Sequence, residues 1–443
     1  MAVNNQQEQG VASRVAASQV LDHVLNTGKS LDDALDHVLG TSRMPENDQK
    51  LVRAICMTVF RHLPQIDETL RQVMAQKRDP KPKILHNVLR VGVAQLLYMD
   101  VPDHAAISVT VSASGSLKLN RQKSFVNACL RSVQRERGDA APAPVPHLDR
   151  LPAWLSDNWI KHYGQQRAER IAKASLQPAP IDITLSNLHA LHENGQYPDG
   201  DALVPWSIRV SNPVGQVTSW PGFSSGAWWV QDLAASLSIN MLGDVHDKSV
   251  LDIGAAPGGK TMQLTTRGAR VTAIDISGSR MARVAENLKR ISQNKTMHPV
   301  KRVTADACTW ESIEAFDAIV IDAPCSSTGT LRRHPELPWI RSENEVMNLS
   351  MIQRDLLTHA SKMVKSGGHL LYVTCSLQPE EGEIQVEWFL NQNKEFKEIK
   401  DIPESLHGFL SPGLNGIGFR TFPDKLAEKG GMDGFFMVLL QRQ

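Results

Sequence analysis

The sequence predicts a multidomain protein in which an all-α domain is followed by a small α+β module and then by an α/β domain with a parallel sheet. Apolar residues recur at helical spacing from residue 10 to residue 137. A Pro- and Ala-rich stretch follows, and from residue 248 short apolar runs alternate with helical patterns. The chain of 443 residues is also longer than one hydrophobic core usually organises. We therefore expect three parts, 1–145, 146–235 and 236–443.

Composition and the N-terminus favour a globular protein of the cytoplasm. Hydrophobic residues make up 41% and charged residues 21% of the chain, and no apolar run approaches the roughly 20 residues that span a membrane. The first residues, MAVNNQQEQG, are polar and lack the apolar stretch of a signal peptide. We expect a soluble, cytoplasmic protein with no membrane partner.

The chain has five cysteines, an odd number that argues against a disulfide framework in a protein without secretion signals. No C-x-x-C pair is present to suggest zinc, so we expect no metal. Each cysteine is either a buried apolar thiol or a reactive one. The five are Cys56, Cys129, Cys308, Cys325 and Cys375.

Residues 10–137 are predicted to form amphipathic helices. Val20, Leu21 and Val24 recur at helical spacing, and LVRAICMTVFRHL and ILHNVLRVGVAQLLYM continue the pattern. In SFVNACLRSVQRER the apolar residues share one face, which places Cys129 in the core. Residues 71–137 carry 12 Lys/Arg against 4 Asp/Glu, whereas residues 1–70 carry 6 against 9. This basic charge fits either an RNA-facing surface or a solvated helix face.

The next region predicts a linker and a small mixed module. Residues 138–152, GDAAPAPVPHLDRLP, have the composition of a semi-rigid spacer. WLSDNWIKHYG then predicts a helix, and IDITLSN and ALVPWSIRV predict strands separated by turn-forming residues. This part is either a small α+β module, to which we assign RNA binding, or a lead-in to the next domain.

From Lys248 onward, strands alternate with helices, as in a parallel sheet with crossover helices. The strand candidates are short, apolar and β-branched, which is typical of strands buried on both faces. They are SVLDIG, RVTAIDI, VKRVTADA, FDAIVIDAP and HLLYVTCS, with helices predicted at 259–267, 279–291 and 349–364.

The first of these strands leads into a glycine-rich loop, GAAPGGKT, at residues 254–261. Glycines let the backbone approach a ligand closely, and the following helix presents free N–H groups there. The spacing is neither that of a P-loop nor that of the G-x-G-x-x-G dinucleotide motif. The loop therefore indicates a nucleotide-type ligand bound in another way.

Carboxylates end the next two strands. Asp275 ends the second strand, where its two oxygens suit the two hydroxyls of an adenosine ribose. Asp306 ends the third strand and is placed to accept a hydrogen bond from an adenine amino group. Either aspartate alone is most often a turn or helix-cap residue. Together with the glycine loop, and without a pyrophosphate motif, they indicate S-adenosylmethionine (SAM).

Two cysteines follow the last two predicted strands, Cys325 in IDAPC and Cys375 in VTCS. Ligands of an open α/β sheet bind at the carboxyl ends of neighbouring strands, so Asp322 and both thiols are expected beside the SAM methyl group. Methylation of cytosine C5 needs such parts, since a thiolate must first add at C6 and an acid must hydrogen-bond N3. This chemistry does not rank the two cysteines, because DNA cytosine methyltransferases use the Pro-Cys thiol.

On these motifs the sequence resembles the RNA cytosine-C5 methyltransferases, in particular the bacterial Fmu/Sun group of small-subunit ribosomal RNA methyltransferases B. The resemblance covers nearly the whole chain and extends upstream to a NusB-like helical domain, in VRAICMTVFRHL, LRVGVAQLLYM, PDHAAISVTV and SFVNACLRSV. The catalytic stretches are VQDLAA, AAPGGKT, FDAIVIDAPCSSTG, RRHPE, YVTCSLQPEE and MDGFF.

The resemblance implies a Rossmann-like SAM methyltransferase domain in which Cys375 is the nucleophile and Cys325 assists release of the product. It implies that Asp322 contacts the cytosine and lies near SAM. It also implies a cytosine of 16S ribosomal RNA, free or partly assembled, as substrate, and we expect a monomer. The implied cofactor-binding residues are Gly254, Ala255, Ala256, Pro257, Gly258, Gly259, Lys260, Asp275, Asp306 and Asp322.

Three positions depart from the group. Gly254 stands where many relatives have Cys, Ser327 where Gly or Ala is usual, and ADACTW where a Gly-Asp-Gly-like sequence is usual.

Two other functions are weighed against this one. An exocyclic amino methyltransferase would have an Asp/Asn-Pro-Pro-aromatic tip, and a non-catalytic RNA-binding protein would not need the intact SAM loop and thiols. Arg332, Arg333 and His334 suit phosphate contacts or a solvated loop.

Overall fold

The computed structural model describes residues 2–40, 42, 44–74, 79–137, 146–187, 197–292 and 297–443, and only the backbone of residues 2–9. The chain forms two compact units, Met1–Ala172 with Arg333–Ser342, and Lys173–Arg332 with Glu343–Gln443. Part of the predicted linker, 138–145, lies outside the described residues. The three-part division at residues 145 and 235 stays a prediction.

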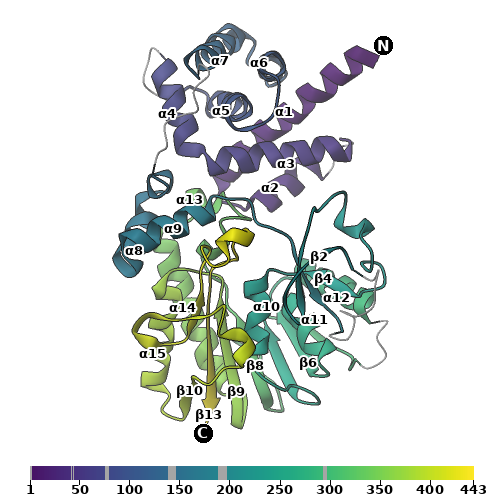
Figure 1. The fold of residues 1–443 in the computed structure, drawn as a ribbon, viewed down its shortest axis with the longest axis vertical. Coiled ribbons are helices and arrows are strands. Elements are labelled where there is room, and N and C mark those ends of the chain that lie inside the picture. Colours follow the sequence, from purple (N-terminus) through teal and green to yellow (C-terminus); the bar gives the residue numbers. More distant parts are fainter. Residues whose placement is uncertain are drawn as a thin grey trace. The chain divides into compact units, whose positions relative to one another are not determined.

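The first unit is all α-helical, as predicted (Figure 1). Helix α5 lies at its centre, because residues on every side of it are buried, and it packs against α1, α3, α6 and α7. Cys129 is buried in the same core. The helices are α1 (Ala2–Thr27), α2 (Leu31–Leu39), α3 (Glu46–Arg61), α4 (Leu63–Val73), α5 (Lys83–Tyr98), α6 (Asp103–Ser116), α7 (Lys123–Arg137), α8 (Ala153–Tyr163) and α9 (Gln165–Ser175), the last of which runs into the second unit.

A short segment from far along the sequence completes this helical unit. Residues 333–342 contain α13 (Leu337–Ile340), and Trp339 packs against the helical core. The Trp339 indole donates to the Phe60 carbonyl (3.1 Å), and the Glu336 carboxylate accepts from the Leu31 backbone N–H (3.2 Å). These residues were predicted to belong to the α/β domain. Their local sequence gives no sign that they pack against helices about 300 residues earlier in the chain.

The second unit begins with a four-stranded antiparallel sheet of order β2-β3-β1-β4. It is formed largely by the two stretches predicted as strands, IDITLSN and ALVPWSIRV. Its apolar core includes Ile183, Ile208 and Trp228. The strands are β1 (Asp182–Leu185), β2 (Gly200–Val204), β3 (Ser207–Val210) and β4 (Trp228–Val230).

A nine-stranded sheet dominates the second unit, with order β11-β12-β13-β9-β8-β5-β6-β7 and β10 paired with β13. The five predicted strands are all present and parallel, as β5 (Ser249–Ile253), β6 (Arg270–Asp275), β7 (Lys301–Thr304), β8 (Phe316–Asp322) and β9 (Val364–Thr374). Sequence analysis did not assign the antiparallel strands β10 (Phe396–Ile399), β11 (Ser411–Pro412), β12 (Phe419–Thr421) and β13 (Phe435–Arg442). The sheet is therefore mixed rather than purely parallel.

Helices cover both faces of this sheet (Figure 1). Alternate residues of β8 point to opposite faces, so Ile319 packs with α14 and α15, whereas Val320 packs with α10 and α11. The helices are α10 (Leu233–Asn240), α11 (Gly259–Thr266), α12 (Gly278–Ile291), α14 (Glu343–Ser361) and α15 (Glu383–Gln392).

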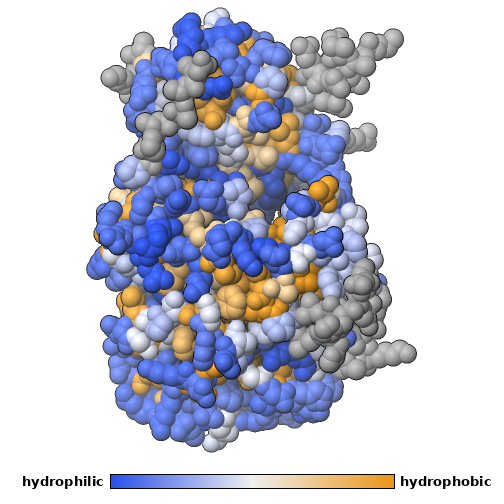
Figure 2. Space-filling view, in the orientation of Figure 1, coloured by the Kyte–Doolittle hydropathy of each residue, from blue (hydrophilic) through white to orange (hydrophobic). Residues whose placement is uncertain are grey.

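Hydrophilic residues cover most of the described surface on the face that Figure 2 shows, and apolar residues appear between them in smaller groups. Among the described residues, no helix combines the length and the apolar character needed to cross a membrane.

Candidate active site

The two predicted thiols lie together at the carboxyl ends of neighbouring strands. Strands β8 and β9 are paired and parallel, with Asp322 opposite Val373. Cys375 directly follows β9, Cys325 lies three residues beyond β8, and their sulfur atoms are 3.4 Å apart. Cys325 is 9% exposed and Cys375 is half-buried. The pair is therefore within contact distance and reachable from one side.

Backbone hydrogen bonds hold the loop that carries Cys325. The Gly329 N–H donates to the Cys375 carbonyl (3.0 Å), and the Gly329 carbonyl accepts from the Gly434 N–H (2.8 Å). A Cβ atom on Gly329 would lie 1.8 Å from the Gly434 carbonyl oxygen, so only glycine fits. The loop thus links the end of β9 to the segment before β13.

A buried carboxylate fixes the same loop from the other side. Glu381 accepts hydrogen bonds from the Ser326 backbone N–H (2.8 Å) and hydroxyl (2.5 Å), and from the Gln353 amide (3.2 Å). Burial raises the pKa of Glu381, although these donors oppose the shift. Glu381 was not predicted to hold this loop. Its partners lie up to 55 residues away in the sequence, so no local pattern reveals the contact.

The two thiols differ in acidity. The hydrogen bond from Cys325 lowers the pKa of Cys375 against the effect of burial, with smaller contributions from Ser327 and Lys260. The same contact, together with burial, raises the pKa of Cys325 well above its usual value. Of the two thiols, Cys375 is therefore the one disposed to ionise.

Asp322 forms an ion pair with the lysine of the glycine loop. Lys260 Nζ lies 2.7 Å from Asp322 Oδ2, and the side chains are 8% and 31% exposed respectively. Burial alone would lower the pKa of Lys260, but Asp322 raises it above its usual value. Lys260 is therefore charged and fixed against the end of β8, beside the cysteines.

The glycine loop closes tightly over the sheet edge. Gly254 has a φ of +75°, and a Cβ atom there would lie 2.4 Å from the Asp322 carbonyl oxygen. Only glycine takes this conformation without strain. The loop then leads into α11, which begins at Gly259 and leaves its first N–H groups without helical partners.

Asp252, which sequence analysis did not single out, lies fully buried beneath the loop. One carboxylate oxygen accepts from the Thr261 hydroxyl (2.6 Å), and the other has no hydrogen-bond partner among the described residues. Burial raises the pKa of Asp252 to about 7. An aspartate in the middle of the apolar run SVLDIG was the signal that could have identified it.

The two strand-end aspartates differ in setting. Asp275 is 4% exposed, and its oxygens accept from the backbone N–H groups of Ala256 (3.3 Å) and Ser277 (2.9 Å). Oδ2 also lies 3.4 Å from the exposed Arg280 guanidinium, so a ribose diol fits with one hydroxyl on Oδ1 and the other on Oδ2 in place of Arg280. Asp306 is exposed and accepts from the Cys308 N–H (2.9 Å).

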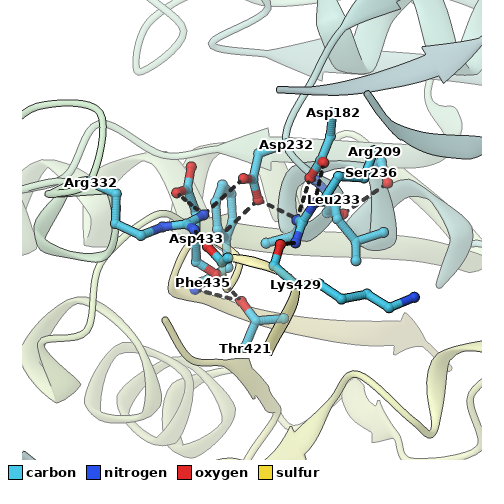
Figure 3. Close-up of polar contacts among 12 residues, drawn as sticks. Asp182, Arg209, Asp232, Leu233, Ser236, Arg332, Thr421, Lys429, Asp433 and Phe435 are labelled. Carbon is cyan, nitrogen blue, oxygen red and sulfur yellow. Dashed lines mark hydrogen bonds and ion pairs between the residues drawn. The ribbon is translucent and has the colours of Figure 1, made fainter. Parts of the chain in front are cut away.

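Arg332 is neither placed to contact phosphate nor part of a solvated loop, the two alternatives that the sequence left open, because it is buried in an acidic network. It is 1% exposed, and its guanidinium lies 3.3 Å from Asp232 and 3.0 Å from Asp433, toward which Figure 3 shows it pointing. The network continues through the ion pair of Arg209 with Asp182 (2.7 Å) in the four-stranded sheet (Figure 3). Arg333 and His334 belong to the helical unit, and their predicted phosphate contacts stay a prediction.

The chain is a SAM-dependent methyltransferase of Rossmann-like fold. Three observations define this class: the parallel strands β5 to β9, the glycine loop after β5, and the match of this region to a methyltransferase family model. Residues 239–441 match the family model described as 16S rRNA methyltransferase RsmB/F, and residues 11–135 match the NusB family. The chain belongs to the 16S rRNA methyltransferase RsmB/F family, which confirms the predicted family, fold class and cofactor.

Curated relatives and solved structures agree with this assignment. Ribosomal RNA small subunit methyltransferase B of Sodalis glossinidius is 35% identical over 85% of this chain and 88% of its own length. The protein of that name from Vibrio cholerae is 32% identical over 97% of each chain. The crystal structure of PH0851 superposes with a TM-score of 0.76 at 24% identity over 98% of each chain. NSun6 from Pyrococcus horikoshii with SFG has a TM-score of 0.56 at 21% identity, covering 66% of this chain and 98% of that one. At these identities the two structures show a shared fold.

Proposed function

We propose that this chain transfers a methyl group from SAM to C5 of a cytosine in 16S ribosomal RNA through a covalent adduct of Cys375. The observation that carries the proposal is the 3.4 Å contact between the sulfur atoms of Cys325 and Cys375, which favours ionisation of Cys375 over that of Cys325. Relatives named ribosomal RNA small subunit methyltransferase B support the choice of RNA.

Cys375 begins the reaction as a thiolate. Its sulfur adds to C6 of the cytosine, and the electrons of the C5–C6 double bond move onto C5, with negative charge building at N3. Lys260 Nζ lies 2.7 Å from Asp322 Oδ2, so the ammonium can pass a proton to that carboxylate, and the resulting Asp322 carboxylic acid donates it to N3 as the charge builds. Asp322 is the member of the pair that contacts the cytosine.

Cys325 assists release of the methylated base. Once C5 carries the methyl group, its proton leaves to a base, the C5–C6 double bond re-forms and the bond between Cys375 and C6 breaks. The protonated Cys325 thiol lies 3.4 Å from the departing sulfur and stabilises it by a hydrogen bond. Without Cys325, the leaving thiolate loses this stabilisation.

The residues that would hold SAM are those of the glycine loop and the two strand ends. When bound, SAM supplies an electrophilic methyl group on a positively charged sulfur. The loop Gly254–Lys260 offers close backbone approach, Asp275 retains capacity for a ribose diol, and the unpartnered Asp252 oxygen lies under the loop. Asp306 would accept from the adenine amino group, and Asp322 would border the methyl group.

RNA is the expected macromolecular partner, as free 16S ribosomal RNA or a partly assembled subunit. The target cytosine must leave any stacked helix to reach a sulfur pair as buried as this one. The basic stretch of the helical unit and the small β-sheet module are the proposed RNA-binding regions. A monomeric state and a cytoplasmic location stay predictions.

Radiolabelled SAM and unmodified 16S ribosomal RNA test the proposal directly. Wild type should transfer label, and digestion of the RNA should yield 5-methylcytosine. Cys375→Ala should abolish transfer, whereas Cys308→Ala should not, because Cys308 is a half-buried thiol whose pKa is raised to about 11 by burial. Full transfer by Cys375→Ala, or a product methylated on the exocyclic amine, would refute the proposal.

A further inference from the structure

Ser327, in the loop between Cys325 and Gly329, has a backbone conformation that serine rarely adopts. Its φ is +58° and its ψ is +26°, in the left-handed region that glycine occupies without strain. A residue with a side chain is less stable here by about 1 kcal/mol or more. This chain therefore keeps a hydroxyl at a position that favours glycine.

The hydroxyl of Ser327 lies against the thiol pair. Its oxygen is 3.3 Å from Cys375 Sγ and 3.9 Å from Cys325 Sγ. The loop fixes this geometry, because the Ser327 carbonyl accepts both the backbone N–H (3.0 Å) and the hydroxyl (2.9 Å) of Thr330. Ser327 is thus the only alcohol for which the described residues show a contact with Cys375 Sγ.

The Cys375 thiol donates to the Ser327 hydroxyl oxygen. We propose that Ser327 is a further catalytic residue, whose hydroxyl donates a hydrogen bond back to the Cys375 sulfur once the thiol has lost its proton and stabilises it as a thiolate. The inference deepens the proposed function and rests on it. A hydrogen bond to an ionised sulfur is charge-assisted and stronger than one between neutral groups. The strained backbone of Ser327 then has a functional reason, because it places the hydroxyl where it makes Cys375 a better nucleophile.

Four ionisable or polar groups act on Cys375 besides its burial. The hydrogen bond from Cys325 lowers its pKa most, Ser327 and Lys260 lower it further, and Asp322 raises it. Ser327 is the one of the four that has no ionisable side chain, so its removal changes no formal charge at any pH of the experiment. Among the described residues, the Ser327 hydroxyl has two competing acceptors on Cys325, the carbonyl oxygen at 3.4 Å and the more distant Sγ at 3.9 Å. The experiment must therefore distinguish donation to sulfur from donation to that carbonyl.

Two matched variants separate the hydroxyl from the backbone. Ser327→Ala removes the hydroxyl and keeps both the Cβ atom and the strained φ, whereas Ser327→Gly removes the hydroxyl and the strain together. The measurement is the rate at which iodoacetamide alkylates Cys375 as a function of pH. The full-length enzyme is used without RNA or SAM, and the Cys375 peptide is quantified by mass spectrometry after brief labelling.

Both variants should move the midpoint of Cys375 alkylation upward by about one pKa unit, the shift expected for loss of one charge-assisted hydrogen bond. Methyl transfer at neutral pH should fall about tenfold in both, and it should recover as the pH is raised above the new midpoint. Ser327→Gly should melt no lower than wild type, which keeps the test valid if Ser327→Ala folds poorly.

An unchanged midpoint in Ser327→Gly would overturn the proposal, because the hydroxyl would then donate to the Cys325 carbonyl. A shift in Ser327→Ala alone would also overturn it, since the cause would be the backbone. Alkylation does not depend on methyl transfer. Failure of this inference is therefore distinguishable from failure of the proposed function, which would appear as full methyl transfer by Cys375→Ala.

Discussion

The sulfur atoms of Cys325 and Cys375 lie 3.4 Å apart although 50 residues separate them in the sequence. The contact is made possible by the parallel pairing of β8 and β9, which brings their carboxyl ends to one edge of the sheet. The hydrogen bond between them lowers the pKa of Cys375 and, together with burial, raises the pKa of Cys325, so the two cysteines differ in acidity. Their proposed division of labour follows from this difference.

Cys325→Ala should accumulate a covalent complex with RNA, visible as a slowly migrating band on a denaturing gel. The leaving sulfur of Cys375 loses its hydrogen-bond donor, so breakdown of the adduct slows more than methylation does. Formation of the adduct should also slow at neutral pH, because the contact with Cys325 is the main cause of the lowered Cys375 pKa. Cys375→Ala and the double variant should give no band, and a band in Cys375→Ala instead would show that the roles are exchanged.

Arg332→Met should lower the free energy of unfolding by about 3 kcal/mol, because it leaves the buried carboxylates of Asp232 and Asp433 without their cation. Urea denaturation measures the loss. Arg302→Met is the matched control, since Arg302 lies exposed on β7 and should change stability by less than about 0.5 kcal/mol. An unchanged stability for Arg332→Met, with a weaker salt dependence of RNA binding, would instead support the phosphate contact that sequence analysis expected.

Gly254→Ala should weaken SAM binding at least tenfold, measured by isothermal titration calorimetry. The added Cβ would lie 2.4 Å from the Asp322 carbonyl oxygen, which forces the loop away from the end of β8. Gly243→Ala is the control, because Gly243 also has a positive φ (+64°) but no atom within 4 Å of an added Cβ. It should lose about 1 kcal/mol of stability and keep its affinity for SAM. Equal losses of affinity in both variants would contradict the proposed role of the loop.

Asp252→Asn should gain stability relative to wild type as the pH rises from 5 to 8. Burial raises the pKa of Asp252 from 3.8 to about 7, so the folded state binds its proton more tightly than the unfolded state does. The stability that this proton contributes is complete below about pH 4 and is lost as the pH rises through about 7. Asparagine keeps the neutral side chain at every pH, and melting temperatures of both proteins across this range measure the difference.

Asp317→Asn provides the contrast for this titration. Although burial opposes the shift, hydrogen bonds from Lys365 and Ser249 lower the pKa of Asp317 to about 2. Its contribution is lost only as the pH falls through that value, so the melting-temperature difference between Asp317→Asn and wild type should stay constant between pH 5 and 8. A constant difference for Asp252→Asn as well would show that Asp252 is ionised throughout.

The order of the elements could be predicted because it depends on neighbours in the sequence. Helical spacing identified the first unit, and short apolar runs identified β5 to β9 with their crossover helices. Strand β13, FFMVLLQR, has a similar apolar run, but it lies antiparallel beside β9 rather than following the βα alternation. A pattern built on alternation could not place it.

The sequence by itself determined which residue types stand at the strand ends: the glycine loop, Asp275, Asp306, Asp322 and the two cysteines. Tertiary structure alone decided which thiol is the more acidic, that Arg332 is buried between Asp232 and Asp433, and that residues 333–342 complete the helical unit. The physical reason is the separation along the chain of the residues that interact. Periodicity and turn chemistry act between residues close in the chain, whereas acidity and burial depend on groups that lie 50 to about 300 residues apart in sequence.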